Sequence, residues 1–256
     1  MSIAEPAARG EVTIRNLSKS YSIKGRRLDV LQGVSNHIRA GESLAIVGAS
    51  GSGKTTLLRV LAGLEDADRG EVLIDRQPVR GVGRDRAVIF QEPRLLPWLS
   101  VLDNVAFPLE NRGLGKSEAR ASARHYIKLV GLSDFADALP SQLSGGMAQR
   151  VGIARALAVK PEILLLDEPF GALDAMTKIT MQEELARIWR EERVTMILVT
   201  HDLEEAVYLA DRVLILPKDK GGRTREIEVD LPRPRNRSEP RFVRLREQLL
   251  NEFGLH

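Results

Sequence analysis

The order of apolar and polar residues predicts two kinds of strand in this chain. Residues 11–17 alternate apolar with polar side chains, which is the period of a strand with one buried face. Residues 30–39 alternate in the same way, although Asn36 places a polar side chain in the buried phase. We expect these early strands to pair in an antiparallel sheet. The other short strands predicted for that sheet are 70–75 and 86–90.

Continuous apolar runs of strand length indicate a second sheet that is covered on both faces. The first run, "SLAIV" at 43–47, leads into a glycine-rich loop and then into a predicted helix with Leu57, Leu58, Leu61 and Leu64 on one face. Toward the C-terminus, buried strands alternate with helices, which predicts a parallel sheet with right-handed crossovers. The strands are 162–167, 194–200 and 212–216, and the helices are 175–192 and 203–211.

Strand-like runs disappear between residues 95 and 160, and three helical stretches replace them. The sequence therefore predicts an α/β fold with a parallel sheet, an N-terminal antiparallel β subdomain and an inserted helical subdomain at about 95–160. We expect this main domain to cover residues 11–222. A basic C-terminal extension, 223–256, is expected to follow it.

Composition excludes several classes of protein. The 256 residues include no cysteine, so disulfides and cysteine-ligated zinc are excluded, and the net charge of +3 is too small to imply nucleic-acid binding. No apolar run approaches the ~20 residues that span a bilayer, and the N-terminus lacks a signal pattern. We expect a soluble chain whose membrane role, if it has one, comes through a partner.

Arginines are concentrated near the C-terminus. Two interpretations stay open, a solvated tail and a surface that docks on a protein or a lipid. The arginines are Arg233, Arg235, Arg237, Arg241, Arg244 and Arg246.

The loop "GASGSGKT" at 48–55 matches the phosphate-binding pattern G-x-x-x-x-G-K-[ST], between a buried strand and an amphipathic helix. Its glycines allow successive backbone N–H groups to face one concavity, and the helix N-terminus adds partial positive charge. Lys54 can reach the β- and γ-phosphates, and Thr55 can offer its hydroxyl to Mg²⁺. We therefore predict a nucleoside triphosphate site here.

Two carboxylates follow the apolar run "ILLL" at 163–166. Asp167 ends the strand and is predicted to hold Mg²⁺ at the carboxyl edge of the sheet. Glu168 comes next and can act as the general base toward the attacking water. The alternative is that both carboxylates only cap the end of the strand and have no part in chemistry.

A second phosphate-binding segment, "LSGGM" at 143–147, looks incomplete. Ser144 is a good helix N-cap, and Gly145 and Gly146 keep side chains away from an approaching anion. The segment has no lysine and no metal-binding carboxylate nearby. We therefore expect two copies of the chain to pair head to tail, so that each completes the nucleotide site of the other.

These motifs resemble those of the ATP-binding subunit of ABC transporters over nearly the full chain, which implies a P-loop NTPase core that hydrolyses ATP with Mg²⁺. "GASGSGKT" is similar to the Walker A motif, "ILLLDE" to the Walker B motif with its catalytic glutamate, and "LSGGM" to the signature motif. The signature usually ends in glutamine, and Met147 replaces it here.

The resemblance implies a role for several further residues. Gln91 matches the Q-loop glutamine that touches Mg²⁺ and the attacking water, Asp174 matches the D-loop at the dimer seam, and His201 matches the switch histidine. His201 also follows a predicted buried strand, which places it at the same edge of the sheet as Asp167; the alternative is that His201 has only a structural role.

Tyr21 matches an aromatic residue that stacks on adenine in this family; the alternative is an ordinary tyrosine at the end of a strand. The implied nucleotide-binding set is Tyr21, Gly48, Ala49, Ser50, Gly51, Ser52, Gly53, Lys54, Thr55, Thr56, Ser144, Gly145, Gly146 and Asp174; the catalytic set is Glu168, His201 and Gln91; the metal set is Thr55, Gln91 and Asp167.

Residues 94–110 and 230–238 resemble the nitrate, sulfonate and taurine branch of importers, and "FQEPRLLPW" is most similar to aliphatic sulfonate ATPases. The resemblance implies a peripheral protein on the cytoplasmic face of the inner membrane, with two permease subunits and, indirectly, a periplasmic solute-binding protein as partners. Trp98 and Leu99 are candidates for the permease contact, or pack locally. The alternatives are another small solute, such as taurine or nitrate, and a soluble ABC ATPase without a transport role.

Overall fold

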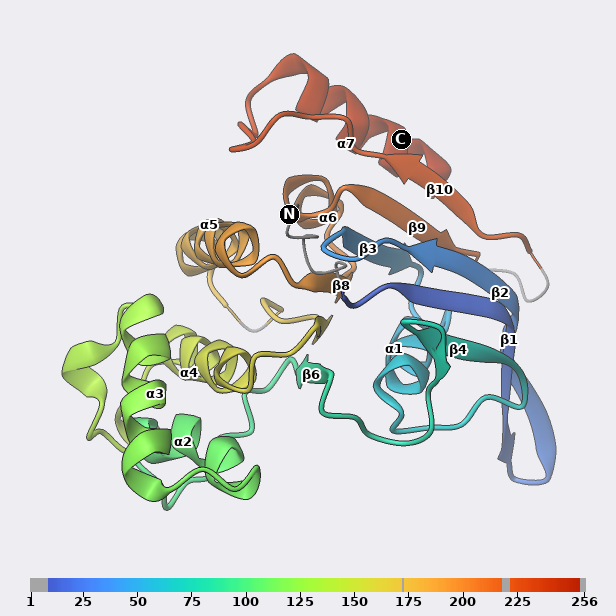
Figure 1. Ribbon diagram of the computed structural model, residues 1–256. Coiled ribbons are helices and arrows are strands. Elements are labelled where there is room, and N and C mark those ends of the chain that lie inside the picture. The colour runs from blue at the N-terminus through green and yellow to red at the C-terminus, as the bar shows by residue number, and fades with distance from the viewer. Residues whose placement is uncertain (1–8, 172, 218–221, 254–256) are drawn as a thin grey trace, which may run out of the picture. The chain divides into compact units, whose positions relative to one another are not determined.

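The computed structural model describes residues 9–171, 173–217 and 222–253. They form two compact units, one from residues up to Asp85 together with residues from Arg193 onward, and the other from Arg86 to Glu192 (Figure 1). In the described ranges, no helix has both the length and the apolar character needed to cross a bilayer.

The first unit begins with the predicted antiparallel sheet, whose strand order is β2-β1-β4-β5. Val12 and Ile14 are buried, as their alternation predicts, and Leu17 is buried because β1 shifts register between Ile14 and Leu17, where Asn16 has a φ of 46°. Asn36 is buried in phase with them because its side chain amide bonds Glu226 and its oxygen accepts a hydrogen bond from Arg212 (2.9 Å). The strands are β1 (Val12–Ile23), β2 (Arg26–Ile38), β4 (Arg69–Ile74) and β5 (Gln77–Pro78).

The first unit also contains the strands that lead to the glycine-rich loop and to His201, in the order β10-β9-β3-β8. β3 pairs in parallel with β8 and β9, and β10 runs antiparallel to β9. Every residue of β3 and β8 is buried, in agreement with their continuous apolar runs. The strands are β3 (Ser43–Gly48), β8 (Thr195–Val199), β9 (Arg212–Leu216) and β10 (Arg225–Glu228); the helices are α1 (Lys54–Ala62), α6 (Leu203–Leu209) and α7 (Pro240–Glu252).

The second unit joins a pair of strands to helices. β6 (Arg86–Ile89) pairs in parallel with β7 (Ile163–Asp167), and the chain between them is helical, as the pattern predicts. α5 (Ala175–Glu192) follows β7. The helices between the strands are α2 (Val101–Asn111), α3 (Lys116–Leu129), the short η1 (Ser133–Phe135) and η2 (Pro140–Gln142), and α4 (Gly145–Ala158).

The predicted α/β class is confirmed, but two details of the prediction are wrong. Strand 86–90 does not join the antiparallel sheet, because β6 pairs in parallel with β7. Leu64 lies beyond the end of α1, where Gly63 stops the helix in a left-handed conformation, and it is 48% exposed. For the arginine-rich segment two interpretations stayed open; Arg235 within it is buried, so the segment is not a fully solvated tail.

Candidate functional site

The phosphate-binding loop connects β3 to α1 and closes tightly on itself. A Cβ atom on Gly48 would lie 2.5 Å from Ser52 Oγ and 3.1 Å from the Leu216 carbonyl oxygen. Gly53 caps α1 with φ of 96°, and a Cβ there would lie 2.7 Å from Leu31 Cδ2. Glycine is required at both positions, at Gly53 for conformation as well as for space.

Hydrogen-bond donors gather around this loop. Lys54 is buried, and its Nζ donates to the carbonyl oxygens of Gly48 (2.8 Å) and Ala49 (3.1 Å), which holds the ammonium group over the loop. Ser52 Oγ is buried and has no partner among the described residues. The first turn of α1 carries no acidic side chain. This donor-rich cradle at a helix N-terminus fits a phosphate group.

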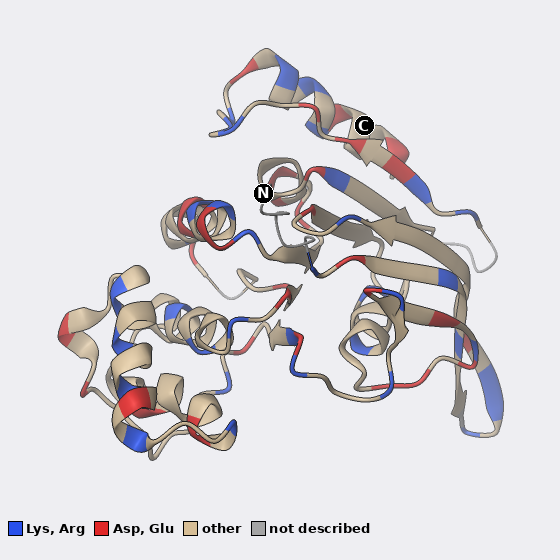
Figure 2. Ribbon diagram, in the orientation of Figure 1, with Lys and Arg blue, Asp and Glu red and all other residues tan. Residues whose placement is uncertain are grey.

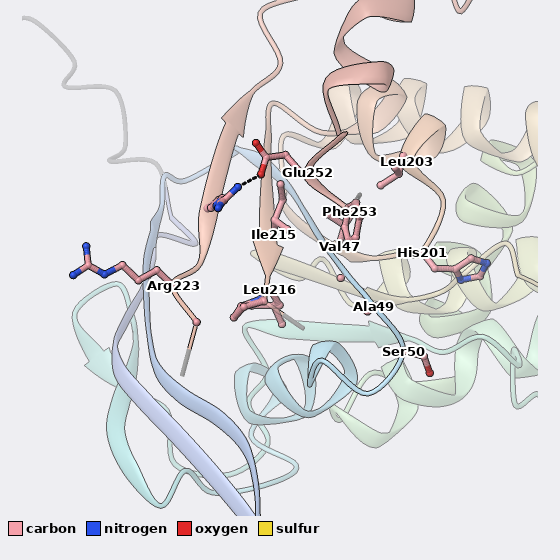
Figure 3. Close-up of a pocket in the computed structure, with 14 residues that line it drawn as sticks. Val47, Ala49, Ser50, His201, Leu203, Ile215, Leu216, Arg223, Glu252 and Phe253 are labelled. Carbon is pink, nitrogen blue, oxygen red and sulfur yellow. Dashed lines mark hydrogen bonds and ion pairs between the residues drawn. The ribbon is translucent and has the colours of Figure 1, made fainter. Parts of the chain in front are cut away.

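His201 and the phosphate-binding loop open on the same cavity of the first unit. The cavity has a volume of about 660 Å³, which is within the range of small-ligand sites. Figure 3 shows Ala49, Ser50 and His201 on one side and Glu252, at the end of α7, on the other. The structure thus brings together two predicted site segments that are about 150 residues apart in the chain.

Tyr21 lies near the end of β1 and is tied to the α1 region. Its hydroxyl bonds Glu65 and Thr56 (3.5 Å), and Lys19 Nζ lies 5.5 Å from its ring centroid. Burial and the bond to Glu65 raise the pKa of the Tyr21 hydroxyl, so it stays neutral at physiological pH. These contacts fix the ring next to α1, and stacking on adenine stays a prediction.

In the second unit, Asp167 and Glu168 follow the buried part of β7 and are both half-buried. Glu168 has a φ of 47°, a left-handed conformation that costs a non-glycine residue roughly 1–3 kcal/mol. Its carbonyl accepts a hydrogen bond from Gly171 N (3.1 Å), and Gln91 Nε2 lies 3.1 Å from where a Cβ on Gly171 would be. The structure thus places Gln91 against the turn that presents Glu168.

The segment after Gln91 is held by residues that the sequence did not single out. Gln149 of α4 donates to the Phe90 carbonyl (3.3 Å), and Arg155 of α4 donates to the carbonyls of Pro93 and Arg94. The fully buried Asn104 of α2 bonds the backbone of residues 96–100 at four points. The only signal for Asn104 was a polar residue among the apolar positions of a predicted helix.

The N-terminus of α4 carries the predicted second phosphate-binding segment. Ser144 caps the helix, its Oγ accepting from Met147 N (3.3 Å). Nothing lies within 4 Å of where a Cβ on Gly145 would be, as expected for a face left open to an anion. Gly146 differs, because its Cβ would lie 2.6 Å from Cγ2 of Thr177 in the same chain. Gly146 is therefore needed for packing on α5.

Thr177 links this helix start to Asp174. Thr177 Oγ1 donates to Asp174 Oδ2 (2.5 Å) and Thr177 N donates to Asp174 Oδ1 (3.1 Å). These two hydrogen bonds lower the pKa of the Asp174 carboxyl below its usual range. The structure therefore joins Gly146 and Asp174 through a threonine that sequence reasoning missed.

We predict that Gly146→Ala lowers the thermal stability of the protein, with a cost of about 1–3 kcal/mol from the forced contact with Thr177 Cγ2. Thr177→Ser removes that methyl group but keeps the hydroxyl that bonds Asp174, so it should restore most of the loss. Thermal unfolding of the two single variants and the double variant measures these changes in stability. Additive losses in the double variant would contradict the predicted contact between a Cβ at position 146 and Thr177 Cγ2.

Comparison with known proteins agrees with these motifs. The profile of the family described as ABC transporter matches residues 31–171. An uncharacterized ABC transporter ATP-binding protein of Methanocaldococcus jannaschii is 48% identical over 242 residues, covering 94% of this chain and 90% of that protein. The taurine import ATP-binding protein TauB of Pseudomonas aeruginosa is 43% identical over 250 residues, covering 94% and 95%. The bicarbonate transport ATP-binding protein CmpC of Synechococcus elongatus is 44% identical over 247 residues, covering 93% of this chain and 37% of that protein.

A solved structure shows the same fold. The ATP-binding cassette MJ0796, in a dimeric post-hydrolysis state bound to ADP and Pi, superimposes with a TM-score of 0.75 at 33% identity, covering 86% of this chain and all of that chain. Its ligands are the products of ATP hydrolysis. With the family profile, the relatives and the phosphate-binding loop in agreement, the chain belongs to the ATP-binding, ATP-hydrolysing proteins of the ABC transporter family.

Proposed function

We propose that the chain energises the import of a small solute, of the aliphatic sulfonate class, through a separate membrane permease. The observation that carries the ATPase half of this proposal is the glycine-closed loop in which Lys54 sits, opening on one cavity with His201. The importer half is supported by the relatives named above.

The proposed reaction is hydrolysis of the terminal phosphate of ATP. Lys54 and the loop amides hold the β- and γ-phosphates, while His201 contacts the γ-phosphate and orients the attacking water. Glu168 accepts a proton from that water as its oxygen bonds the γ-phosphorus. The bond from the γ-phosphorus to the β–γ bridging oxygen breaks, and ADP and inorganic phosphate leave.

The donor set proposed for Mg²⁺ consists of oxygen atoms, as this cation prefers. Thr55 offers a hydroxyl, Gln91 an amide oxygen and Asp167 a carboxylate, and Asp167 stands at the end of β7 with its side chain half-buried. When bound, Mg²⁺ neutralises charge on the phosphate oxygens. Tyr21 is proposed to stack on the adenine.

The second half of each reaction centre is proposed to come from another copy of the chain. Gly145 leaves an open face at the capped N-terminus of α4, a 14-residue helix that can receive the outer face of a phosphate. Ser144, Gly145, Gly146 and Asp174 of one copy would then face the nucleotide of the other. The dimeric state of the MJ0796 cassette supports this arrangement.

Aliphatic sulfonates are the solute class we propose. Taurine, which gives TauB its name, is itself an aminoalkyl sulfonate, and TauB matches nearly the whole chain. Bicarbonate import is the second candidate, supported by the likeness to CmpC, and nitrate import rests only on the resemblance of the sequence motifs. The chain would act at the cytoplasmic face of the inner membrane with two permease subunits and a periplasmic solute-binding protein, and Trp98, which is 72% exposed, is a candidate permease contact.

Purification of the tagged chain from native membranes, followed by reconstitution with its permease and solute-binding protein, tests the proposal. Taurine and short alkanesulfonates should stimulate ATP hydrolysis, whereas nitrate and bicarbonate should not. Stimulation by bicarbonate or nitrate alone would make the sulfonate assignment wrong. If no membrane protein accompanies the chain, the importer role is wrong and a soluble ATPase remains.

A further inference from the structure

The helix that follows His201 controls where this histidine lies. Thr200 Oγ1 donates to the buried Glu205 carboxylate of α6 (2.9 Å), and Asp202 N donates to Thr200 Oγ1 (3.0 Å). The Asp202 side chain also caps α6. Because both neighbours of His201 are bonded to α6 or belong to its cap, a shift of the helix shifts the histidine.

α6 has only seven residues, too few for a helix that is stable by itself in water. Arg235, from the C-terminal segment, bonds the carbonyl groups at its end. The guanidinium donates to the carbonyls of Val207 (2.8 Å), Tyr208 (3.2 Å) and Ala210, and also to Val229 (3.1 Å) outside the helix. These are carbonyls that a helix C-terminus otherwise leaves without a partner, and a cation is favoured there.

Arg233 connects the same helix end to the strand that carries the phosphate-binding loop. It donates to the Leu209 carbonyl (2.7 Å) and to Asp211 Oδ1 (2.8 Å). Asp211 Oδ2 accepts from the backbone N–H of Ser43 (3.0 Å), and Ser43 Oγ donates to the Leu209 carbonyl (2.9 Å). Ser43 is the first residue of β3, so the end of α6 is fixed to the strand that leads to the loop.

Arg237 holds the side of α6. Its guanidinium carbon lies 3.7 Å from the ring centroid of Tyr208, and its Nε lies 3.3 Å from Glu204 in the first turn. Arg246 of α7 approaches the same carboxylate at 3.4 Å. We call Arg233, Arg235 and Arg237 the arginine clamp; Figure 2 shows the basic residues along the segment that leads into α7.

Arg235 is a full charge inside the protein, whereas the side chains of Arg233 and Arg237 are 16% and 20% exposed. The Arg235 side chain is 2% exposed, and burial together with the charge of Arg233 lowers its pKa to about 10, so it remains protonated at pH 7. A buried guanidinium is tolerated where carbonyl or carboxylate oxygens surround it, as they do here. These arginines are therefore built into the first unit.

We propose that the arginine clamp is a positioning device for His201, an inference that rests on the proposed part of His201 in ATP hydrolysis. The clamp fixes α6 at its end and along its side, and ties it to β3 through Asp211. His201 and the phosphate-binding loop, which line one cavity, are thereby held in a fixed relation. A misplacement of about 1 Å is enough to lower a rate by roughly a hundredfold.

The test compares Arg235→Lys and Arg237→Met in the full chain. Lysine keeps the charge but lacks the fork that reaches several carbonyls at once, and Arg237→Met removes the contacts along the side of α6. Each variant should lower kcat by about tenfold or more, while the dissociation constant of ATP changes by no more than about twofold. The control is Arg244→Met, an exposed arginine of α7, which should match the wild type.

A double-mutant cycle with His201→Ala separates positioning from general loss of structure. If the clamp acts through His201, Arg237→Met should cause no further fall in kcat once the histidine is gone. Equal losses with and without His201 would overturn the inference, as would unchanged kcat in both folded clamp variants. A wild-type chain that does not hydrolyse ATP would instead overturn the proposed function itself.

Discussion

Glu168→Gln should lower the rate of ATP hydrolysis by roughly 10²–10⁴-fold and leave ATP binding intact. Glutamine keeps the size of the side chain and its place in the left-handed turn after β7, but it cannot accept a proton from the attacking water. Steady-state release of phosphate and equilibrium binding of ATP, measured on the same preparation, give the two quantities.

Glu247→Gln is the matched control, because Glu247 is an exposed carboxylate on α7 and the substitution makes the same chemical change. It should leave the rate unchanged. A Glu168→Gln protein that hydrolyses ATP at the wild-type rate would show that another group takes the proton, and Glu168 would then be only a strained end of a strand.

Ser144→Arg should lower ATP turnover by at least about a hundredfold while each subunit still binds ATP. The long side chain fills the open face in front of α4, where Gly145 leaves space, and so blocks the approach of a second copy's nucleotide. The phosphate-binding loop belongs to the other unit of the chain and is not altered. Phosphate release and ATP binding are again the measurements.

Two controls separate this block from simpler effects. Ser144→Ala removes the helix cap, at a cost of about 1 kcal/mol, without filling the space. Ser141→Arg adds the same charge at an exposed position in η2. Ser141→Arg should keep most of the activity, and Ser144→Ala, which also loses a hydroxyl proposed to face the nucleotide, should be less damaging than Ser144→Arg. If Ser141→Arg were as damaging as Ser144→Arg, added charge rather than the blocked face would explain the loss.

Local patterns were sufficient to predict most of the elements. The apolar runs that become β3 and β8 are buried on both faces, and the long helix α5 has the predicted bounds. The pairing of β6 was not predictable in this way, because alternation and length describe a strand but do not identify its neighbour. Its partner β7 lies more than 70 residues further along the chain.

The contacts around the candidate site were harder to predict, since they join segments that are distant in sequence. Thr177 gave no signal, because only the fold brings its methyl group to Gly146. The C-terminal arginines suggested a surface feature, whereas Arg235 is buried against the carbonyls of α6, which precede it by about 25 residues. A count of charges cannot distinguish a solvated arginine from one that donates hydrogen bonds to the last carbonyls of a helix.

The central claim is that two copies are needed to cut one ATP, and mixing two inactive variants tests it most directly. Lys54→Ala removes the phosphate-binding lysine and Ser144→Arg blocks the helix face of α4, so each variant alone should be inactive. In an equal mixture, a pair of unlike copies has one intact centre. The mixture should therefore recover up to about a quarter of the wild-type rate, if one centre suffices and pairing is random. A mixture that stays inactive while its copies associate, or a Ser144→Arg protein that is fully active alone, would contradict the claim.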